Sequence, residues 1–277
     1  MKTELNKVKQ NNVITCLRVL FFYILSVVIL IAVSSITKRF PKKYEDVSTV
    51  ILSSLLTFEL VILFTGWEKL KCEQAGIVPG KSTFKRFAIG FLIGLSMAVL
   101  QVLISLCFAH KHLDVAINPT MNIGIMITNL LLYFFVAFRE ELVFRSYSLR
   151  ALDYSIKAVA ALSVIVVLFI LEHIVAGMDW KTAIIGSGLG GILFGLAALR
   201  TKGLALPIGL HFAWNFGQWC TGFKNETGIY KAVVEKGYEL QVERIGLWAF
   251  IIVMCMAIIL VLFLTSKSRL QENSLKN

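Results

Sequence analysis

Long apolar runs separated by short polar connections recur along the whole chain. They fall near residues 17–36, 47–66, 84–109, 121–140, 155–176, 182–199, 204–220 and 245–265. A helix needs about 20 predominantly apolar residues to cross the hydrocarbon core of a bilayer, and these runs are of that order. The pattern predicts an all-α polytopic membrane protein, a bundle of about eight transmembrane helices, in which residues 1–277 form a single integral membrane domain.

The composition agrees with a membrane domain and argues against a nucleic-acid partner. Hydrophobic residues make up 57% of the chain, charged residues 16%, and the mean hydropathy is +0.76. Soluble domains carry roughly 25% charged residues. The net charge of +11 comes from basic residues that flank the apolar runs, as the positive-inside rule predicts, so no nucleic acid is expected.

The distribution of these basic residues also predicts a topology. Four groups fall on one side if both termini are cytoplasmic: Lys2, Lys7, Lys9 and Arg18; Lys69, Lys71, Lys81, Lys85 and Arg86; Arg200 and Lys202; and Lys267, Arg269 and Lys276. One group, Lys38, Arg39, Lys42 and Lys43, then lies outside. The first apolar run is long for a signal peptide, so we expect it to be a retained helix.

Small residues and cysteines add two expectations about packing. The glycine-rich stretch 186–203 lets neighbouring helices approach closely, which predicts a central place for the sixth span. The five cysteines are scattered singly, without the spacing of a disulfide framework or a zinc-thiolate site.

The first group of ionisable residues within an apolar run is in the segment FREELVFRS. Ionisable groups in hydrocarbon are costly and by default indicate a functional site in the bundle interior. Glu140 and Glu141 project about 100° apart on a helix, so we expect that they cannot both face the same neighbour. Glu141 and Arg145 are spaced to form an ion pair, which leaves Glu140 free as a general base. The alternative is that both glutamates lie at the membrane interface.

Two histidines follow on other apolar runs. His173 comes four residues after Phe169, and His211 four residues before Asn215, so each pair shares a helix face. A lone histidine on an apolar helix is more often structural than a ligand. Two of them, with two glutamates on a third helix, predict that the polar groups satisfy one another or hold a metal ion, because the bilayer offers no water.

Taken in order, the three motifs resemble the CPBP family, which contains the CAAX proteases and bacteriocin-processing enzymes and is also called the Abi or type II CAAX prenyl endopeptidase family. The motifs are EExxxR (Glu140, Glu141, Arg145), FxxxH (Phe169, His173) and HxxxN (His211, Asn215). The resemblance covers about residues 120–220, the expected peptidase core. Other intramembrane protease patterns are absent from the sequence: no H-E-x-x-H, no rhomboid-type serine motif and no pair of membrane aspartates.

The resemblance implies an eight-helix intramembrane metalloprotease or metal-free protease with a site that opens to the cytoplasm. Glu140 and His173 would activate a water, and His211 and Asn215 would hold the tetrahedral oxyanion. Glu141, Arg145 and Phe169 would support the site. Zn²⁺ bound by Glu140, His173 and His211 and a metal-free glutamate mechanism are both compatible with these residues.

The leading hypothesis is therefore an endopeptidase of the bacterial plasma membrane that cleaves a membrane-associated peptide or a membrane protein. The alternative, from another class, is a non-proteolytic immunity or regulatory binding protein on the same fold. A transporter is a third hypothesis, which the lack of inverted repeats disfavours.

Overall fold

The computed structural model describes residues 12–78, 80–224 and 227–274, so Lys2, Lys7, Lys9 and Lys276 lie outside the described residues. The main helices are α1 (Asn12–Thr37), α2 (Lys42–Trp67), α3 (Lys81–Ala109), α4 (Ile123–Val143), α6 (Ala158–Val175), α8 (Gly188–Thr201), α9 (Ala205–Cys220) and α10 (Glu239–Ser274). Short elements connect them: the strands β1 (Leu113–Ile117) and β2 (Tyr230–Val234), the helices α5 (Leu149–Ile156) and α7 (Trp180–Thr182), and the π-helical turns η1 (Phe144–Ser148) and η2 (Ala183–Ser187).

The helices confirm an all-α polytopic bundle. Within the described residues, seven helical segments are long and apolar enough to cross a membrane. The remaining predicted run, 204–220, is α9, whose 16 residues are fewer than those of any of the seven candidate spans. Large apolar side chains cover the outside of the bundle; Val159 and Val175, for example, are 80% and 87% exposed. Such a surface suits lipid rather than water.

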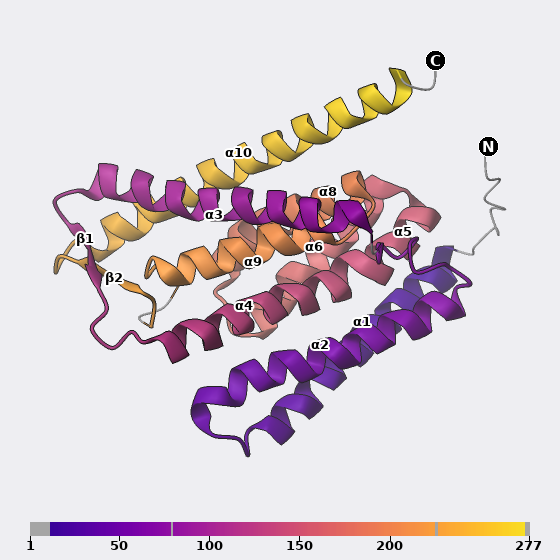
Figure 1. Ribbon diagram of the computed structural model, residues 1–277, viewed down its shortest axis with the longest axis horizontal. Coiled ribbons are helices and arrows are strands. Elements are labelled where there is room, and N and C mark those ends of the chain that lie inside the picture. The colour runs from indigo at the N-terminus through magenta and orange to yellow at the C-terminus, as the bar shows by residue number, and fades with distance from the viewer. Residues whose placement is uncertain (1–11, 79, 225–226, 275–277) are drawn as a thin grey trace.

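The arrangement in space is that of nearly parallel and antiparallel helices with a small sheet at one end (Figure 1). Helix α1 begins, and α10 ends, at the end of the bundle opposite the sheet (Figure 1). The sheet pairs β1 with β2 in antiparallel register, from Leu113 opposite Val234 to Ile117 opposite Tyr230. The apolar runs did not predict it, because both strands are short and lie in connections that appear as loops in the sequence.

Close backbone contact between α3 and α9 fixes the helix that carries His211. A Cβ atom at Gly90 or Gly94 of α3 would overlap the carbonyl of Leu206 or Leu210 in α9, and one at Gly209 would overlap the carbonyl of Phe87. Gly90 and Gly94 form a GxxxG pattern, which is typical of closely packed membrane helices. The predicted central place of the sixth span is also confirmed, because Trp180–Thr201 is the most buried of the seven candidate spans.

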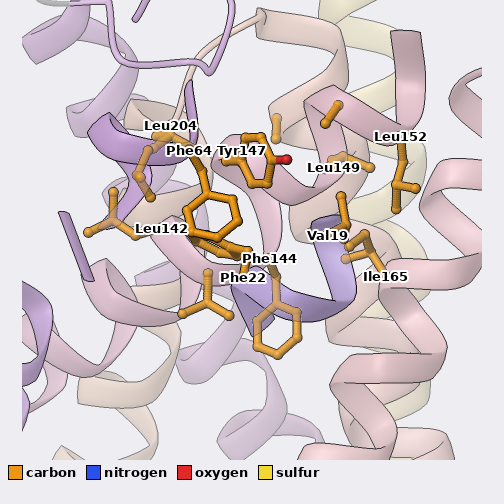
Figure 2. Packing of buried hydrophobic residues seen from close by; sticks show 14 of the residues in the cluster. Val19, Phe22, Phe64, Leu142, Phe144, Tyr147, Leu149, Leu152, Ile165 and Leu204 are labelled. Carbon is orange, nitrogen blue, oxygen red and sulfur yellow. The ribbon is translucent and has the colours of Figure 1, made fainter. Parts of the chain in front are cut away.

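The fourth helix does not end where the polar groups begin. It continues beyond Val143 through η1 into α5, and the chain bends at Ser146, whose φ and ψ are −83° and −115°. An aromatic cluster holds this bend against the first two helices. The rings of Phe22, Phe64 and Tyr147 lie 5.1–5.4 Å apart, and Figure 2 shows them gathered among aliphatic side chains. The bend is thereby fixed directly beside Arg145.

Candidate active site

The residues of the three motifs come from neighbouring helices. Glu140 and Glu141 lie in the last turn of α4, and Arg145 follows in η1. His173 lies in the last turn of α6, and His211 and Asn215 in the middle of α9. Arg145 and Glu141 are fully buried, and Asn215 is buried between its neighbouring helices.

His211 lies between the two glutamates. Its Nδ1 atom is 3.0 Å from Glu141 Oε1, and its Nε2 atom is 3.6 Å from Glu140 Oε2. The expectation that the two glutamates cannot face the same neighbour is therefore wrong. Their side chains do leave the helix in different directions, but an imidazole ring is wide enough for one carboxylate to approach each of its two nitrogens. Only the imidazolium cation can donate to both carboxylates at once.

Glu141 and Arg145 form the predicted ion pair. Arg145 Nη1 is 3.4 Å from Glu141 Oε1, and both side chains are completely buried. The guanidinium group also lies over the ring of Phe169, 4.4 Å from its centroid, with Phe144 and Phe194 farther away at 5.4 and 5.7 Å. Aromatic faces attract a cation, and this attraction strengthens when water is excluded. Glu141 thus has two cationic or polar partners, Arg145 and His211, and connects η1 with α9.

His173 is oriented by its own helix. Its Nδ1 atom is 2.8 Å from the carbonyl oxygen of Phe169, and the two rings meet edge to face at 4.5 Å. Because a carbonyl oxygen only accepts, Nδ1 must be the donor, and in the neutral ring Nε2 is then the acceptor. His173 also interacts electrostatically with Glu140. Phe169 therefore supports both His173 and Arg145.

Four further residues outside the three motifs complete the surroundings of the site. Phe194 of α8 stacks on His211, with 4.4 Å between ring centroids and 14° between ring planes. Arg139 Nη1 lies 3.5 Å from Glu172 Oε1, beside His173. Lys224, just beyond α9, donates a hydrogen bond of 2.8 Å to Asn215 Oδ1. Only Glu172 and Arg139 carried a signal in the sequence, as charges within apolar runs.

The two glutamates keep unused acceptor capacity. Oε2 of Glu140 and Oε2 of Glu141 accept no hydrogen bond from any described residue. A buried polar atom without a partner is costly and calls for an explanation, such as a bound water, ion or substrate. The Oε2 atom of Glu140 is also the one that faces His211, at 3.6 Å from Nε2.

The prediction of a Zn²⁺ site at Glu140, His173 and His211 stays a prediction, although the three side chains are not gathered into one group in this arrangement. Among the described residues, no three histidine, cysteine, aspartate or glutamate side chains are grouped so that they could hold a metal ion. His211 directs one nitrogen to Glu141 and His173 directs one to a carbonyl, so each has only Nε2 left for a metal.

One protein-family model matches the part of the chain that contains the site. The family model of type II CAAX prenyl endopeptidase Rce1-like proteins matches residues 122–217, which contain all the motif residues. Neither the curated proteins nor the solved structures yielded a match. The matched family is a protease family, and the resemblance predicted from the three motifs is confirmed over residues 122–217.

Proposed function

We propose that this protein is an intramembrane endopeptidase that hydrolyses a peptide bond in a membrane-associated peptide or a membrane protein. The single observation that carries the proposal is the position of His211 between Glu140 and Glu141, with Asn215 one turn farther along the same helix. This arrangement lies within the segment that is similar to a protease family.

In the proposed reaction, Glu140 is the general base. Its unpartnered Oε2 atom removes a proton from a water, whose oxygen attacks the carbonyl carbon of the substrate. His173, with Nε2 as its acceptor, orients the same water. When the carbon–nitrogen bond breaks, Glu140 returns the proton to the leaving amine. One water is consumed for each peptide bond cleaved, and Glu140 returns to its starting protonation state.

The negative charge that develops on the substrate oxygen requires donors. His211, as an imidazolium cation, and the amide of Asn215 are proposed to supply them from adjacent turns of α9. Glu141 holds the first of these donors in place through Nδ1, and Arg145 in turn holds Glu141. The supporting roles proposed for Glu141, Arg145 and Phe169 follow from these contacts.

The same geometry supports a proposal for orientation. Helices α1 and α10 have their free ends on the same side of the bundle, as expected for an even number of crossings (Figure 1). Together with the basic residues flanking the spans, this supports the proposal that both termini are cytoplasmic.

The test compares cells that produce the wild-type protein with cells that produce Glu140→Gln. New peptide N-termini in the membrane fraction are identified by mass spectrometry. We expect a set of N-termini that appears only with the wild type. An identical set in both strains would overturn the proposal and favour the non-proteolytic immunity or regulatory protein.

A second measurement addresses the metal. Purified protein is treated with a strong chelator and assayed on a synthetic peptide that spans a Glu140-dependent cleavage site. We expect activity to persist, since the described residues form no three-ligand group. Loss of activity that zinc restores would instead assign Glu140, His173 and His211 as metal ligands.

A further inference from the structure

We propose that Lys224 is a positioning residue for Asn215: its ammonium group binds the amide oxygen and so directs the amide NH₂ into the site. The proposal rests on the proposed function, in which Asn215 donates to the oxyanion. Lys224 lies outside the three motifs and outside the segment that the family model matches, which ends at residue 217.

The chain folds back at the end of α9 to bring Lys224 to the site. The backbone amides of Phe223 and Lys224 both donate to the carbonyl of Gln218, and Gly222 has a φ of +78°. A Cβ atom at Gly222 would overlap the backbone of β2, so glycine is required there for both space and conformation. Asn215 lies about 7.5 Å of helix rise before the end of α9, within reach of a lysine side chain that turns back.

The ammonium group is held at two points. Its Nζ atom is 2.8 Å from Asn215 Oδ1 and lies over the ring of Tyr133 in α4, 5.1 Å from the centroid. Both partners are buried, although much of Lys224 itself is exposed. Through these two contacts Lys224 links the connection between α9 and β2 to α4 and to α9.

The hydrogen bond decides which end of the amide faces the substrate. An asparagine side chain has an oxygen that accepts and a nitrogen that donates, and the two are close in size. An ammonium group only donates, so it binds the oxygen and the NH₂ group must point the other way. An oxyanion needs a donor, and with the amide reversed it would meet a second oxygen. Loss of Lys224 would remove this choice of orientation.

Among the described residues, the groups that interact with the ammonium group of Lys224 come from α4 and α9. Glu140 and Tyr133 belong to α4, and Asn215 belongs to α9. Although much of the side chain is exposed, partial desolvation of its ammonium end lowers the pKa of Lys224 to about 8, and the negative charge of Glu140 opposes part of this shift.

A double-mutant cycle tests the proposal. The rate of cleavage is measured on the synthetic peptide that spans a Glu140-dependent site, for the wild type, Lys224→Met, Asn215→Ala and the double variant. We expect Lys224→Met to lower kcat roughly 10-fold to 100-fold with KM unchanged, since it degrades one oxyanion donor. In the Asn215→Ala background, the same change should have no further effect.

Three controls keep the outcomes separate. Lys224→Arg retains a cationic donor and should recover most of the rate. Lys236 is an exposed lysine between β2 and α10, and Lys236→Met should equal the wild type. Thermal unfolding of each variant in detergent excludes loss of folded protein as the cause. An equal loss in the single and double backgrounds, or a wild-type rate for Lys224→Met, would overturn the positioning role. If no Glu140-dependent cleavage exists, the proposed function falls first and this proposal falls with it.

Discussion

Glu68 at the end of α2 and Glu140 near the end of α4 are both carboxylates in the interior of the bundle, but their surroundings differ. Each oxygen of Glu68 has a partner: Arg18 Nη1 lies 3.0 Å from Oε2, and the hydroxyl of Tyr147 donates to Oε1 over 3.2 Å. Glu140 has an oxygen with no hydrogen-bond partner among the described residues and only a 3.6 Å contact to His211.

This difference in partners supports a structural role for Glu68 and the proposed catalytic role for Glu140. A buried ion pair is tolerated when its remaining hydrogen-bonding capacity is also satisfied, as at Glu68, where the pair connects α1, α2 and η1. The free capacity of Glu140 carries a cost that the proposed role as general base would explain. Burial alone would not distinguish the two residues, whereas the count of partners for each oxygen does.

The largest effect should come from substitution of Glu140, with the same substitution at Glu68 as its control. Glu140→Gln keeps the size of the side chain but removes the base, so we expect the cleavage rate to fall about 10²-fold to 10⁴-fold. Glu68→Gln should leave the rate per folded molecule within about 2-fold, because no step uses that carboxylate. Rates are measured on the synthetic peptide and normalised to folded protein. Comparable losses of rate in both variants would remove the distinction between the two carboxylates.

The next effect concerns the donors of α9. Asn215→Ala removes one oxyanion donor and should lower kcat about 10²-fold to 10³-fold. Asn215→Asp replaces the NH₂ group with an oxygen and should be no better than alanine, although it keeps the shape. Activity of the aspartate variant near the wild-type level would mean that the site needs an acceptor at Asn215 rather than a donor.

The sequence was sufficient for the bundle and for the identity of the motif residues. The long apolar runs predicted all eight main helices, and the spacing of Glu141 and Arg145 predicted their ion pair. The sequence was not sufficient to predict that both glutamates contact His211. Helical spacing gives the direction in which a side chain leaves the helix, but not the width of the group that it meets. Lys224 was out of reach for another reason: its contact depends on a chain reversal that no periodicity encodes.

A smaller effect, on stability, should appear at the structural cluster. Arg18→Met leaves the buried Glu68 carboxylate without its cation, and we expect a loss of about 3 kcal/mol in the free energy of unfolding. The guanidinium group of Arg18 also lies over the ring of Trp67, 5.1 Å from the centroid, so the packing of α1 on α2 should weaken with it. Unfolding in detergent is followed by circular dichroism.

Arg39→Met serves as the matched control for that change, because Arg39 is an exposed cation of the first connection. It should leave the free energy of unfolding within about 0.5 kcal/mol of the wild type. Equal destabilisation by the two substitutions would show that the pair at Glu68 contributes nothing specific.

The smallest expected effect is a dependence on pH that only the catalytic region should show. Because burial lowers the pKa of Lys224 to about 8, the ammonium form is present below that pH and is lost as the pH rises through it. A neutral amine accepts as well as donates, so it no longer forces the orientation of Asn215. We therefore expect kcat of the wild type to fall above about pH 8, and Lys224→Arg to keep its rate to higher pH because a guanidinium group stays charged. Parallel pH profiles of the wild type and Lys224→Arg would show that the amide of Asn215 is oriented without the ammonium group. In that case the proposed cleavage site, like the cluster at Glu68, would not depend on a titratable lysine.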